Sequence, residues 1–329
     1  MVLIVTHKED LHPTKVIQLL NNWNVPVFRL NTDTFLCDYD VEWNCINGKT
    51  SFTIRNLHND LCIHSYEISS IWMRRYFKPQ FERNSVTEEN IKSHNLLEAR
   101  GFLEYLYNNL SDRFSIGNYV FDDVGNSKTL QLQLATELGI KVPDTCYSNT
   151  KDAILRLASR YDYLILKSIR SDYVFNSQTE CQQVFYAQKV ASSFLNGIPN
   201  EDFSQTINFV QAYIEKDFEL RITVVCDDVF ACKICSQSME EDRGKVDWRQ
   251  GVDYDMQHDA FLLPPEIAEF CWTYLKRLHL NFGCFDFIVT PKGEYVFLEC
   301  NPNGQWLWIE ELTGMKISES IAHHLKIGK

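Results

Sequence analysis

The last third of the chain places two acidic residues and an amide in otherwise apolar segments. Asp286 lies in CFDFIVT, and Glu299 and Asn301 lie in EYVFLECN, with the turn PKG between the two segments. If the turn centres on KG, Asp286 faces Glu299 across a hairpin, and Asn301 shares the sheet face of Glu299. Two facing carboxylates need a counter-charge or a shared proton. With an amide oxygen beside them they suit a hard divalent cation such as Mg²⁺, whereas a solvated face paired with lysines is the alternative.

Two lysines occupy positions where a positive charge needs an explanation. Lys167 lies in LILKSI, an otherwise apolar segment, and Lys128 lies where a helix is expected to begin. A lysine in an apolar strand can extend its ammonium to solvent, and a cation at a helix N-terminus is disfavoured by the helix dipole. Binding of a phosphate by either ammonium is the functional alternative.

The segment FVQAYIEKDFELRITVV predicts two strands joined by an extended connection. Such a connection can offer backbone N–H and C=O groups to the edge of a base, here from Gln211, Ala212, Tyr213 and Ile214. Glu219 and Arg221 alternate on one face of the strand that follows.

The first part of the chain predicts an α/β layer. A strand at residues 2–6, a helix at 13–23 and a second strand in PVFRLN favour a parallel sheet. Residues 40–72 alternate like antiparallel strands and end in SIWMRR, and residues 86–110 have the spacing of a helix. The first domain boundary is expected at residues 116–121.

The rest of the chain predicts a mixture of helices and strands. A helix capped by Asn126 or Ser127 should run to about Leu138, where Gly139 ends it. Residues 183–196 are expected to be helical, and a tight hairpin is expected at Asp227 and Asp228. Strands are expected at 163–169, 209–214, 219–226 and 229–235, a helix at 265–279, and a final hairpin that carries the acidic residues.

Composition narrows the class of protein. The chain has 329 residues, 45% hydrophobic and 23% charged, with a net charge of −12, which indicates a soluble protein and argues against nucleic-acid binding. The eleven cysteines include one CKIC without a second pair, so reduced cysteines in a cytoplasmic protein are expected rather than a zinc or redox site. No secretory signal or membrane-spanning apolar run is apparent.

The order of these features, from Asn126 to Ile309, resembles the ATP-grasp superfamily. The matching segments are NSK, P-x-T, the strand lysine, QAYI, ELR and DFI with FLECNPNG. SIWMRR, VDWRQG and NPNGQWLWIE make the chain look most like the ATP-grasp peptide maturases of graspetides, the microviridin-type peptides. The resemblance implies an α+β, three-domain ATP-grasp fold, with an α/β pre-ATP-grasp domain at 1–118, a central subdomain at 119–195 and a C-terminal domain with a Mg²⁺ site at 196–329.

The resemblance also implies a role for each candidate residue. It implies nucleotide-phosphate contacts from Lys128 and Lys167, an adenine contact from Gln211, Ala212, Tyr213 and Ile214, and a ribose contact from Glu219. It assigns the phosphate and acyl-phosphate region to Arg221, Lys233 and Arg249, the Mg²⁺ ligands to Asp286, Glu299 and Asn301, and part of the substrate cleft to Arg74 and Arg75.

The implied activity is ATP-dependent macrocyclisation of a ribosomal precursor peptide, made of a leader and a core. Side-chain carboxylates of Asp or Glu would become acyl phosphates, and Thr or Ser hydroxyls or Lys amines would then form ω-esters or ω-amides. A homodimer is expected, with leader contacts at about 186–208. The alternatives are an ATP-grasp ligase that joins an amine or amino acid to a small molecule or protein, and a nucleotide-binding protein without ligase activity. The segment after Lys167, SIRSDYVFNSQTEC, departs from many ATP-grasp enzymes because it contains no glycine.

Overall fold

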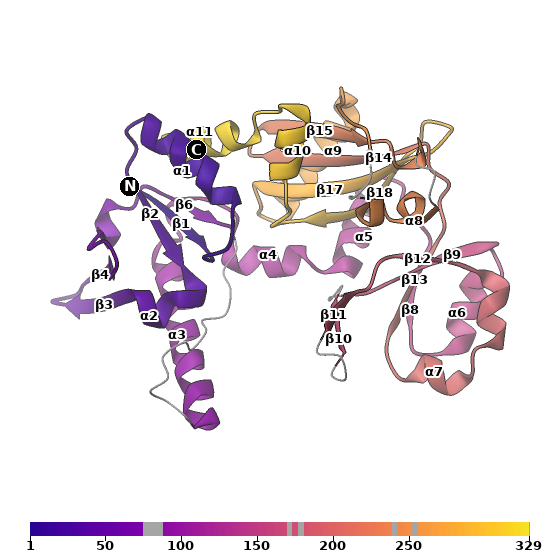
Figure 1. Ribbon diagram of the computed structural model, residues 1–329, viewed down its shortest axis with the longest axis horizontal. Helices are drawn as coiled ribbons and strands as arrows, with labels where there is room; N and C mark the ends of the chain where they lie inside the picture. Colours follow the sequence, from indigo (N-terminus) through magenta and orange to yellow (C-terminus); the bar gives the residue numbers. More distant parts are fainter. Residues whose placement is uncertain (75–87, 170–172, 177–180, 239–241, 252–255, 329) are drawn as a thin grey trace.

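The computed structural model describes residues 1–74, 88–169, 173–176, 181–238, 242–251 and 256–328. The chain forms three sheet-centred units, one at the left of the view and two, one above the other, towards the right (Figure 1). A mainly parallel sheet lies at the left of the view, a five-stranded antiparallel sheet at the upper right and a four-stranded antiparallel sheet at the lower right.

The N-terminal sheet has the order β2-β1-β6-β7, and its neighbouring strands are parallel. Its strands are β1 (Val2–Thr6), β2 (Val27–Asn31), β6 (Ser70–Met73) and β7 (Phe114–Ile116), and α1 (His12–Asn22) connects β1 to β2. The opening strand–helix–strand unit therefore forms as predicted. The expectation of antiparallel strands up to SIWM is wrong at its end, because β6 pairs in parallel with β1.

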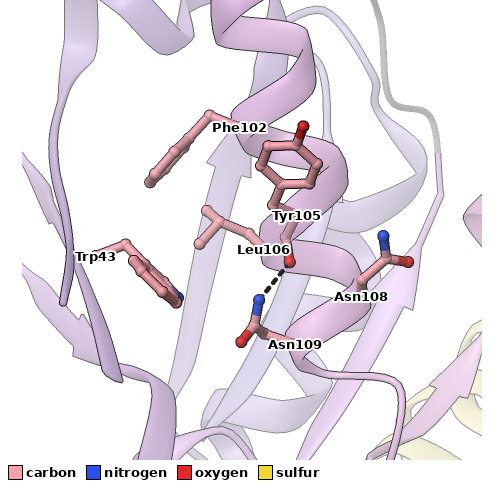
Figure 2. A pocket seen from close by; sticks show the side chains of 6 residues that line it. All are labelled: Trp43, Phe102, Tyr105, Leu106, Asn108 and Asn109. Carbon is pink, nitrogen blue, oxygen red and sulfur yellow. Dashed lines mark hydrogen bonds between the residues drawn. The ribbon is translucent and has the colours of Figure 1, made fainter. Parts of the chain in front are cut away.

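A second layer covers one face of this sheet. It contains α2 (Phe35–Asp38), the antiparallel strands β3 (Tyr39–Ile46), β4 (Lys49–Asn56) and β5 (Cys62–His64), and the long helix α3 (Glu89–Asn109). An apolar hollow of about 390 Å³ lies between Trp43 of β3 and Phe102, Tyr105 and Leu106 of α3 (Figure 2). No candidate residue within the described ranges lines this hollow, so it is separate from the cavity where those residues gather.

The five-stranded sheet, called the large sheet below, has the order β16-β15-β14-β17-β18 and is antiparallel. Its strands are β14 (Phe218–Val225), β15 (Asp228–Ile234), β16 (His258–Ala260), β17 (Phe282–Val289) and β18 (Tyr295–Asn301). Alternate residues of β14 face a core built with α5 (Lys128–Glu137) and α9 (Pro265–Arg277). The intervening residues, Glu219 and Arg221 among them, therefore point to the other face.

The four-stranded sheet, called the small sheet below, has the order β12-β9-β13-β8. Its strands are β8 (Thr145–Ser148), β9 (Tyr163–Lys167), β12 (Gln188–Ala191) and β13 (Asn208–Ala212), packed on α6 (Lys151–Ala158) and α7 (Asn200–Ser204). A separate hairpin pairs β10 (Tyr173–Asn176) with β11 (Cys181–Val184). The predicted helix at 183–196 is wrong, because β12 pairs with β9 and the sheet supplies the backbone hydrogen bonds that a helix would have made.

Three elements pack across the predicted domain limits. β13 belongs to the small sheet, and α5 packs on the large sheet. α11 (Ile317–Ile327) packs against α1 and the N-terminal sheet, where the Ser70 hydroxyl donates to the Leu325 carbonyl at 2.6 Å. The limits 1–118, 119–195 and 196–329 stay a proposal about the order of the domains along the chain.

Three shorter helices complete the described chain: α4 (Tyr119–Gly125), α8 (Asp242–Val246) and α10 (Leu307–Thr313). α4 runs from the N-terminal sheet towards the two antiparallel sheets (Figure 1). In the described ranges, no helix combines the length and the apolar character needed to cross a membrane.

Candidate active site

A cavity of about 680 Å³ opens between the large and small sheets. Its walls come from β14, β17 and β18 on one side, from β9 and β13 on the other, and from α5 and the segments at 246–249 and 303–308. The candidate residues that line it are Lys128, Lys167, Gln211, Ala212, Tyr213, Ile214, Glu219, Arg221, Arg249, Asp286, Glu299 and Asn301. The structure thus gathers most of the predicted site residues around one space.

The final hairpin sets Asp286 directly opposite Glu299, and Cys284 opposite Asn301. This register is the one predicted, but the chain reaches it differently. Near the turn the pairing is one residue tighter, with Val289 opposite Tyr295. A bulge that leaves Leu298 unpaired then restores the predicted register at the acidic pair. Two departures from a regular hairpin therefore cancel at the site.

Cations compensate both facing carboxylates. Arg221 is directly opposite Asp286 on β14 and donates from Nη1 to Asp286 Oδ2 at 2.6 Å, and the Lys128 ammonium contacts Glu299. Burial raises the pKa of Asp286. Burial alone would also raise the pKa of Glu299, but Lys128 and Lys167 outweigh it and lower that pKa to about 2. At neutral pH the Glu299 carboxylate is consequently ionised and can offer its oxygens to a metal ion.

The position of Lys128 depends on a neighbour that sequence reasoning missed. Gln131, one turn further along α5, is fully buried. Its amide donates to the carbonyls of Cys300 at 2.7 Å and Gly125 at 2.6 Å, and its oxygen accepts from the Cys300 N–H at 3.2 Å. This contact fixes the start of α5 against the end of β18. The sequence offers one signal, an amide where the other residues of that helix face are apolar.

Lys167 lies on the opposite wall of the cavity. It ends β9, is directly opposite Phe209 of β13, and faces the cavity beside Ile165. Burial lowers the pKa of Lys167. Among the described residues, none forms a hydrogen bond or an ion pair with its ammonium. An anion that enters the cavity would therefore supply a partner for this charge.

The connection after β13 presents a restricted set of backbone groups. The Ala212 N–H donates to the Asp144 carbonyl at 2.8 Å, and the Tyr213 N–H donates to the Tyr163 carbonyl at 3.1 Å. Within the described chain, no hydrogen bond engages the N–H of Ile214. The Gln211 amide is used internally, since it donates to Thr145 Oγ1 at 3.0 Å. Of the backbone N–H groups in this connection, that of Ile214 is thus the one left available within the described chain.

Glu219 is buried beside a lysine that sequence reasoning did not single out. Lys216 contacts the Glu219 carboxylate and donates to the Val246 carbonyl at 3.1 Å, and both residues line the cavity. Burial raises the pKa of Glu219, against the opposing charge of Lys216. The spacing of three residues in EKDFE was the available signal.

Arg249 is held by an acid that was also missed. It lies in a short helical turn, Trp248–Gly251, and donates from Nε at 2.9 Å and from Nη2 at 2.7 Å to the carboxylate of Asp247. Asp247 also accepts from the Ala187 N–H at 3.1 Å. Although burial opposes ionisation, these hydrogen bonds lower the pKa of Asp247. Asp247 therefore joins the segment that carries Arg249 to the connection that leads into β12.

Among the described residues, two of the candidates, Lys233 and Arg74, do not line the cavity. Lys233 is directly opposite Leu220, so it points to the other face of the large sheet from Arg221, and its ammonium lies 4.3 Å from the centre of the Phe218 ring. The expected place of Lys233 in the phosphate region is thus not what the structure shows. Arg74 is 1% exposed and donates to the Asn303 carbonyl at 2.7 Å, and Arg75 lies outside the described residues.

The segment after Asn301 turns sharply against the sheet. A Cβ at Gly304 would lie 2.3 Å from Cys284 Cβ and 2.9 Å from Arg221 Nη2, so only glycine fits there. The two tryptophans after this turn lie in different surroundings. Trp306 is buried, but Trp308 lines the cavity with its ring centre 5.0 Å from that of Trp248. Trp306 therefore belongs to the core, whereas Trp308 forms part of the cavity wall.

The donor set at the hairpin suits Mg²⁺ in its chemistry. Two carboxylates and one amide oxygen are hard ligands, and, in the described part of the chain, no hydrogen bond engages the Asn301 side chain. No cluster of three or more His, Cys, Asp or Glu side chains suited to a metal occurs among the described residues, which fits a site with only two carboxylates. Because Lys128, Lys167 and Arg221 already outnumber Asp286 and Glu299, a divalent cation should bind here together with a polyphosphate.

The chain is similar over its whole length to solved ATP-grasp structures. A RiPP-associated ATP-grasp ligase from Chryseobacterium gregarium, solved with ADP and a leader and core peptide, is 27% identical, with a TM-score of 0.89 over 100% of this chain and 97% of that chain. The macrocyclase MdnC from Microcystis aeruginosa, bound with the precursor peptide MdnA, is 28% identical, with a TM-score of 0.86 over 100% of both chains. The macrocyclase MdnB from the same organism is 26% identical, with a TM-score of 0.78 over 99% of both.

The N-terminal part of the chain matches a family description by itself. Residues 1–122 match the family described as MvdD pre-ATP grasp domain. No curated protein is significantly similar in sequence. Together the matches confirm the predicted fold, an ATP-grasp fold preceded by a pre-ATP-grasp domain.

Proposed function

Taking the chain as an ATP-grasp peptide maturase of the graspetide type, we propose that it macrocyclises a ribosomal precursor peptide at the expense of ATP. The substrate would carry a leader and a core, as the peptides bound to the similar ligase and macrocyclase do. Asp or Glu side chains of the core would be activated, and Thr, Ser or Lys side chains of the same peptide would attack them. The products are ω-ester or ω-amide rings, ADP and phosphate.

One observation carries the proposal. The facing carboxylates Asp286 and Glu299 lie in the same cavity as Lys167, whose ammonium has no partner among the described residues. A polyphosphate with a divalent cation would neutralise this arrangement, and an activated carboxylate is what such a site can make. The full-length similarity to peptide-modifying ligases favours a peptide as the acid.

The chemistry balances in two steps. A carboxylate oxygen of the peptide attacks the terminal phosphorus of ATP, and the bond to ADP breaks, which leaves a mixed acyl phosphate. A hydroxyl or amine of the peptide then attacks the acyl carbon and loses a proton, and phosphate leaves. When bound, Mg²⁺ supplies charge neutralisation at the phosphate oxygens. The acceptor on the peptide decides between an ester and an amide.

We assign the side chains of this protein to binding and orientation. Lys128 and Lys167 would bind phosphate oxygens, and Arg221 would hold Asp286 in place while its other nitrogen keeps the Gln305 carbonyl at 3.2 Å. Arg249 would lie at the acyl-phosphate end, held by Asp247. Glu219 would accept from the ribose and Ile214 would donate to adenine. Asp286, Glu299 and Asn301 would ligate Mg²⁺.

Partner and location follow as further parts of the proposal. We propose a homodimer in a reducing cytoplasm. Because the net charge is −12, we propose no nucleic-acid partner. Arg74 and Arg75 remain candidates for the substrate cleft. In the structure Arg74 contacts the Asn303 carbonyl, so any role of Arg74 in substrate binding would act through that turn.

The test is incubation of the purified protein with ATP, Mg²⁺ and a short precursor encoded beside its gene. Mass spectrometry should show the loss of one water for each link, together with ADP release that depends on the peptide. Recovery of unmodified precursor by a protein that binds ATP normally would contradict the proposal. ADP release that depends on a free amino acid instead would favour a ligase acting on small molecules.

A further inference from the structure

Several hydrogen bonds hold the turn that follows Asn301. The Gly304 N–H donates to the Asn301 carbonyl at 3.1 Å, and the Gln305 carbonyl accepts from Arg221 at 3.2 Å. The Trp306 N–H donates to His12 Nε2 at 3.4 Å. The turn is thus fixed at its C-terminal end by residues of β14 and of the N-terminal domain.

Asn303 fixes the other end of the turn to two further elements. Its amide donates from Nδ2 to Asp122 Oδ2 at 2.8 Å, and its carbonyl accepts from Arg74 Nη1 at 2.7 Å. Asp122 lies in α4, and Arg74 directly follows β6. Asn303 therefore joins the end of the metal-bearing strand to the connecting helix and to the N-terminal sheet at once.

Burial of the Asp122 carboxylate carries a free-energy cost. It is 1% exposed, and its hydrogen-bond donors are neutral: the Asn303 amide and the Asn118 N–H, which donates to Oδ1 at 3.1 Å. Burying an acid with neutral donors alone is unfavourable compared with apolar packing of similar volume. Apolar side chains could attach α4 to the turn at a lower free-energy cost, but they would not fix the direction of the Asn303 amide.

The backbone of α4 is packed so tightly against the turn that it cannot move to accommodate a shift of Asn303. A Cβ at Gly125, the last residue of α4, would lie 2.9 Å from Pro302 Cγ. Pro302 lies between Asn301 and Asn303, so α4 abuts the turn directly. A shift of Asn303 would consequently be transmitted to Asn301 through one rigid residue.

We propose that Asp122 and Arg74 are positioning residues that hold Asn303, and through it the Asn301 side chain, in the direction that metal binding needs. This inference rests on the proposed function, because it takes Asn301 as a ligand of Mg²⁺. Neither Asp122 nor Arg74 touches the nucleotide or the metal in this arrangement. Partners behind metal ligands typically change metal affinity roughly 10- to 100-fold when they are removed.

A reciprocal exchange of the two side chains tests the proposal. Asn303→Asp places two carboxylates face to face, and Asp122→Asn leaves one oxygen to serve two N–H donors. The double variant Asp122→Asn with Asn303→Asp restores both hydrogen bonds. Its amide at position 122 can accept from the Asn118 N–H and donate to the carboxylate at position 303. Asn303→Ala, which adds no charge, serves if a single charged variant does not fold.

The readout is ADP binding by calorimetry at a series of Mg²⁺ concentrations, without peptide. We expect each single variant to raise the Mg²⁺ concentration at half-saturation roughly 10-fold or more, and the double variant to return it to within about threefold of the original protein. ADP affinity in EDTA should stay within about twofold in all variants, since the positioning residues act on the metal ligand.

Asn281→Ala is the matched control. Asn281 also joins the N-terminal domain to the large sheet, donating to the Ser115 carbonyl at 2.6 Å and accepting from the Gly117 N–H at 3.3 Å, but it does not touch the turn. This variant should lower Tm without changing the Mg²⁺ dependence.

Single variants that lower Tm and leave the Mg²⁺ dependence intact would overturn the inference, as would a double variant that fails to recover. An original protein that binds ADP with no dependence on Mg²⁺ would instead contradict the metal assignment in the proposed function.

Discussion

The two walls of the cavity differ in how their charges are satisfied. On the large-sheet wall each carboxylate has a cation before any ligand enters: Arg221 for Asp286 and Lys128 for Glu299. On the small-sheet wall Lys167 faces the cavity without a partner among the described residues. The charges of the large-sheet wall are therefore paired within the protein, whereas the charge of Lys167 on the small-sheet wall has no paired partner in the described chain.

The packing behind the walls differs in the same sense. The large sheet is backed by interlocking aromatic rings, with Phe270 of α9 contacting Phe285, Phe287 and Phe297. The small sheet rests on a smaller core that includes Ile154, Leu164, Phe203 and Val210. A wall with a large aromatic core that carries two facing carboxylates, opposite a wall with a smaller core that carries one cation, is suited to positioning phosphates rather than to covalent chemistry by the protein.

The largest effect is expected on the large-sheet wall. Glu299→Gln keeps the shape of the side chain but removes the charge that Mg²⁺ needs, so peptide-dependent ADP release should fall roughly 10³-fold. Asp286→Asn should act in the same direction. Steady-state kinetics over a range of Mg²⁺ concentrations measures the effect, and a rate within tenfold of the original protein would count against the metal assignment.

A smaller loss is expected on the small-sheet wall. Lys167→Ala removes the ammonium that we propose contacts a phosphate, and it should lower kcat/KM for ATP on the order of 10²-fold. Lys233→Ala is the matched control, because Lys233 also sits in a strand but points away from the cavity. We expect less than about a twofold change for Lys233→Ala. Equal losses in the two variants would show that a lysine need not face the cavity to affect the reaction with ATP, which would contradict the proposed role of Lys167.

Thermal unfolding with and without ligands tests whether the charges that line the cavity favour a metal ion alone or a metal ion together with a nucleotide. Mg²⁺ alone should leave Tm unchanged, because three cations already face two carboxylates. Mg²⁺ with ADP should raise Tm by several degrees, since a ligand at about 100 times its Kd stabilises the folded protein by about 2.7 kcal/mol. A rise with Mg²⁺ alone would mean that the large-sheet wall binds metal without phosphate.

The smallest effect concerns the acid behind the large-sheet wall. Burial raises the pKa of Asp122 from 3.8 to about 7, so the folded protein holds a proton that the unfolded chain releases between these values. The stabilisation of the folded protein by this proton on Asp122 is fully present below pH 3.8 and falls as pH rises towards about 7. Tm measured from pH 5 to pH 8 should show this decline, and Asp122→Asn should reduce it. A decline of the same size in the variant would assign the dependence to other groups.

The sequence was sufficient for features governed by local alternation. The acidic pair was predictable because a short turn brings two strands together and side chains alternate between faces. Even so, the register was right for an incomplete reason, since the bulge at Leu298 offsets the tighter turn. The same alternation contained the answer for Lys233: paired with an even-numbered residue of β14, it cannot share a face with Arg221.

Features that depend on distant contacts were beyond such reasoning. The Asn303 carbonyl and Arg74 are 229 residues apart, and nothing in SIWMRR indicates that its first arginine is buried against a turn of the large sheet. Asp247 and Gln131 were missed for the same reason, because their roles appear only when another domain or strand supplies the partner. Residues 183–196 show the opposite error, in which the partner strand β9 overrides a weak helical pattern.

The packing of α11 on the N-terminal sheet has a consequence for how the chain folds. Ile317, Ile321 and Leu325 are fully buried in a cluster that also contains Val2 and Ile4. Helix α1 covers part of this face through Val16 and Leu20, so the face is fully covered only after α11 has been made. Closing so long a loop is entropically costly and slow, so the N-terminal domain should acquire its final protection from hydrogen exchange late, after both antiparallel sheets have formed.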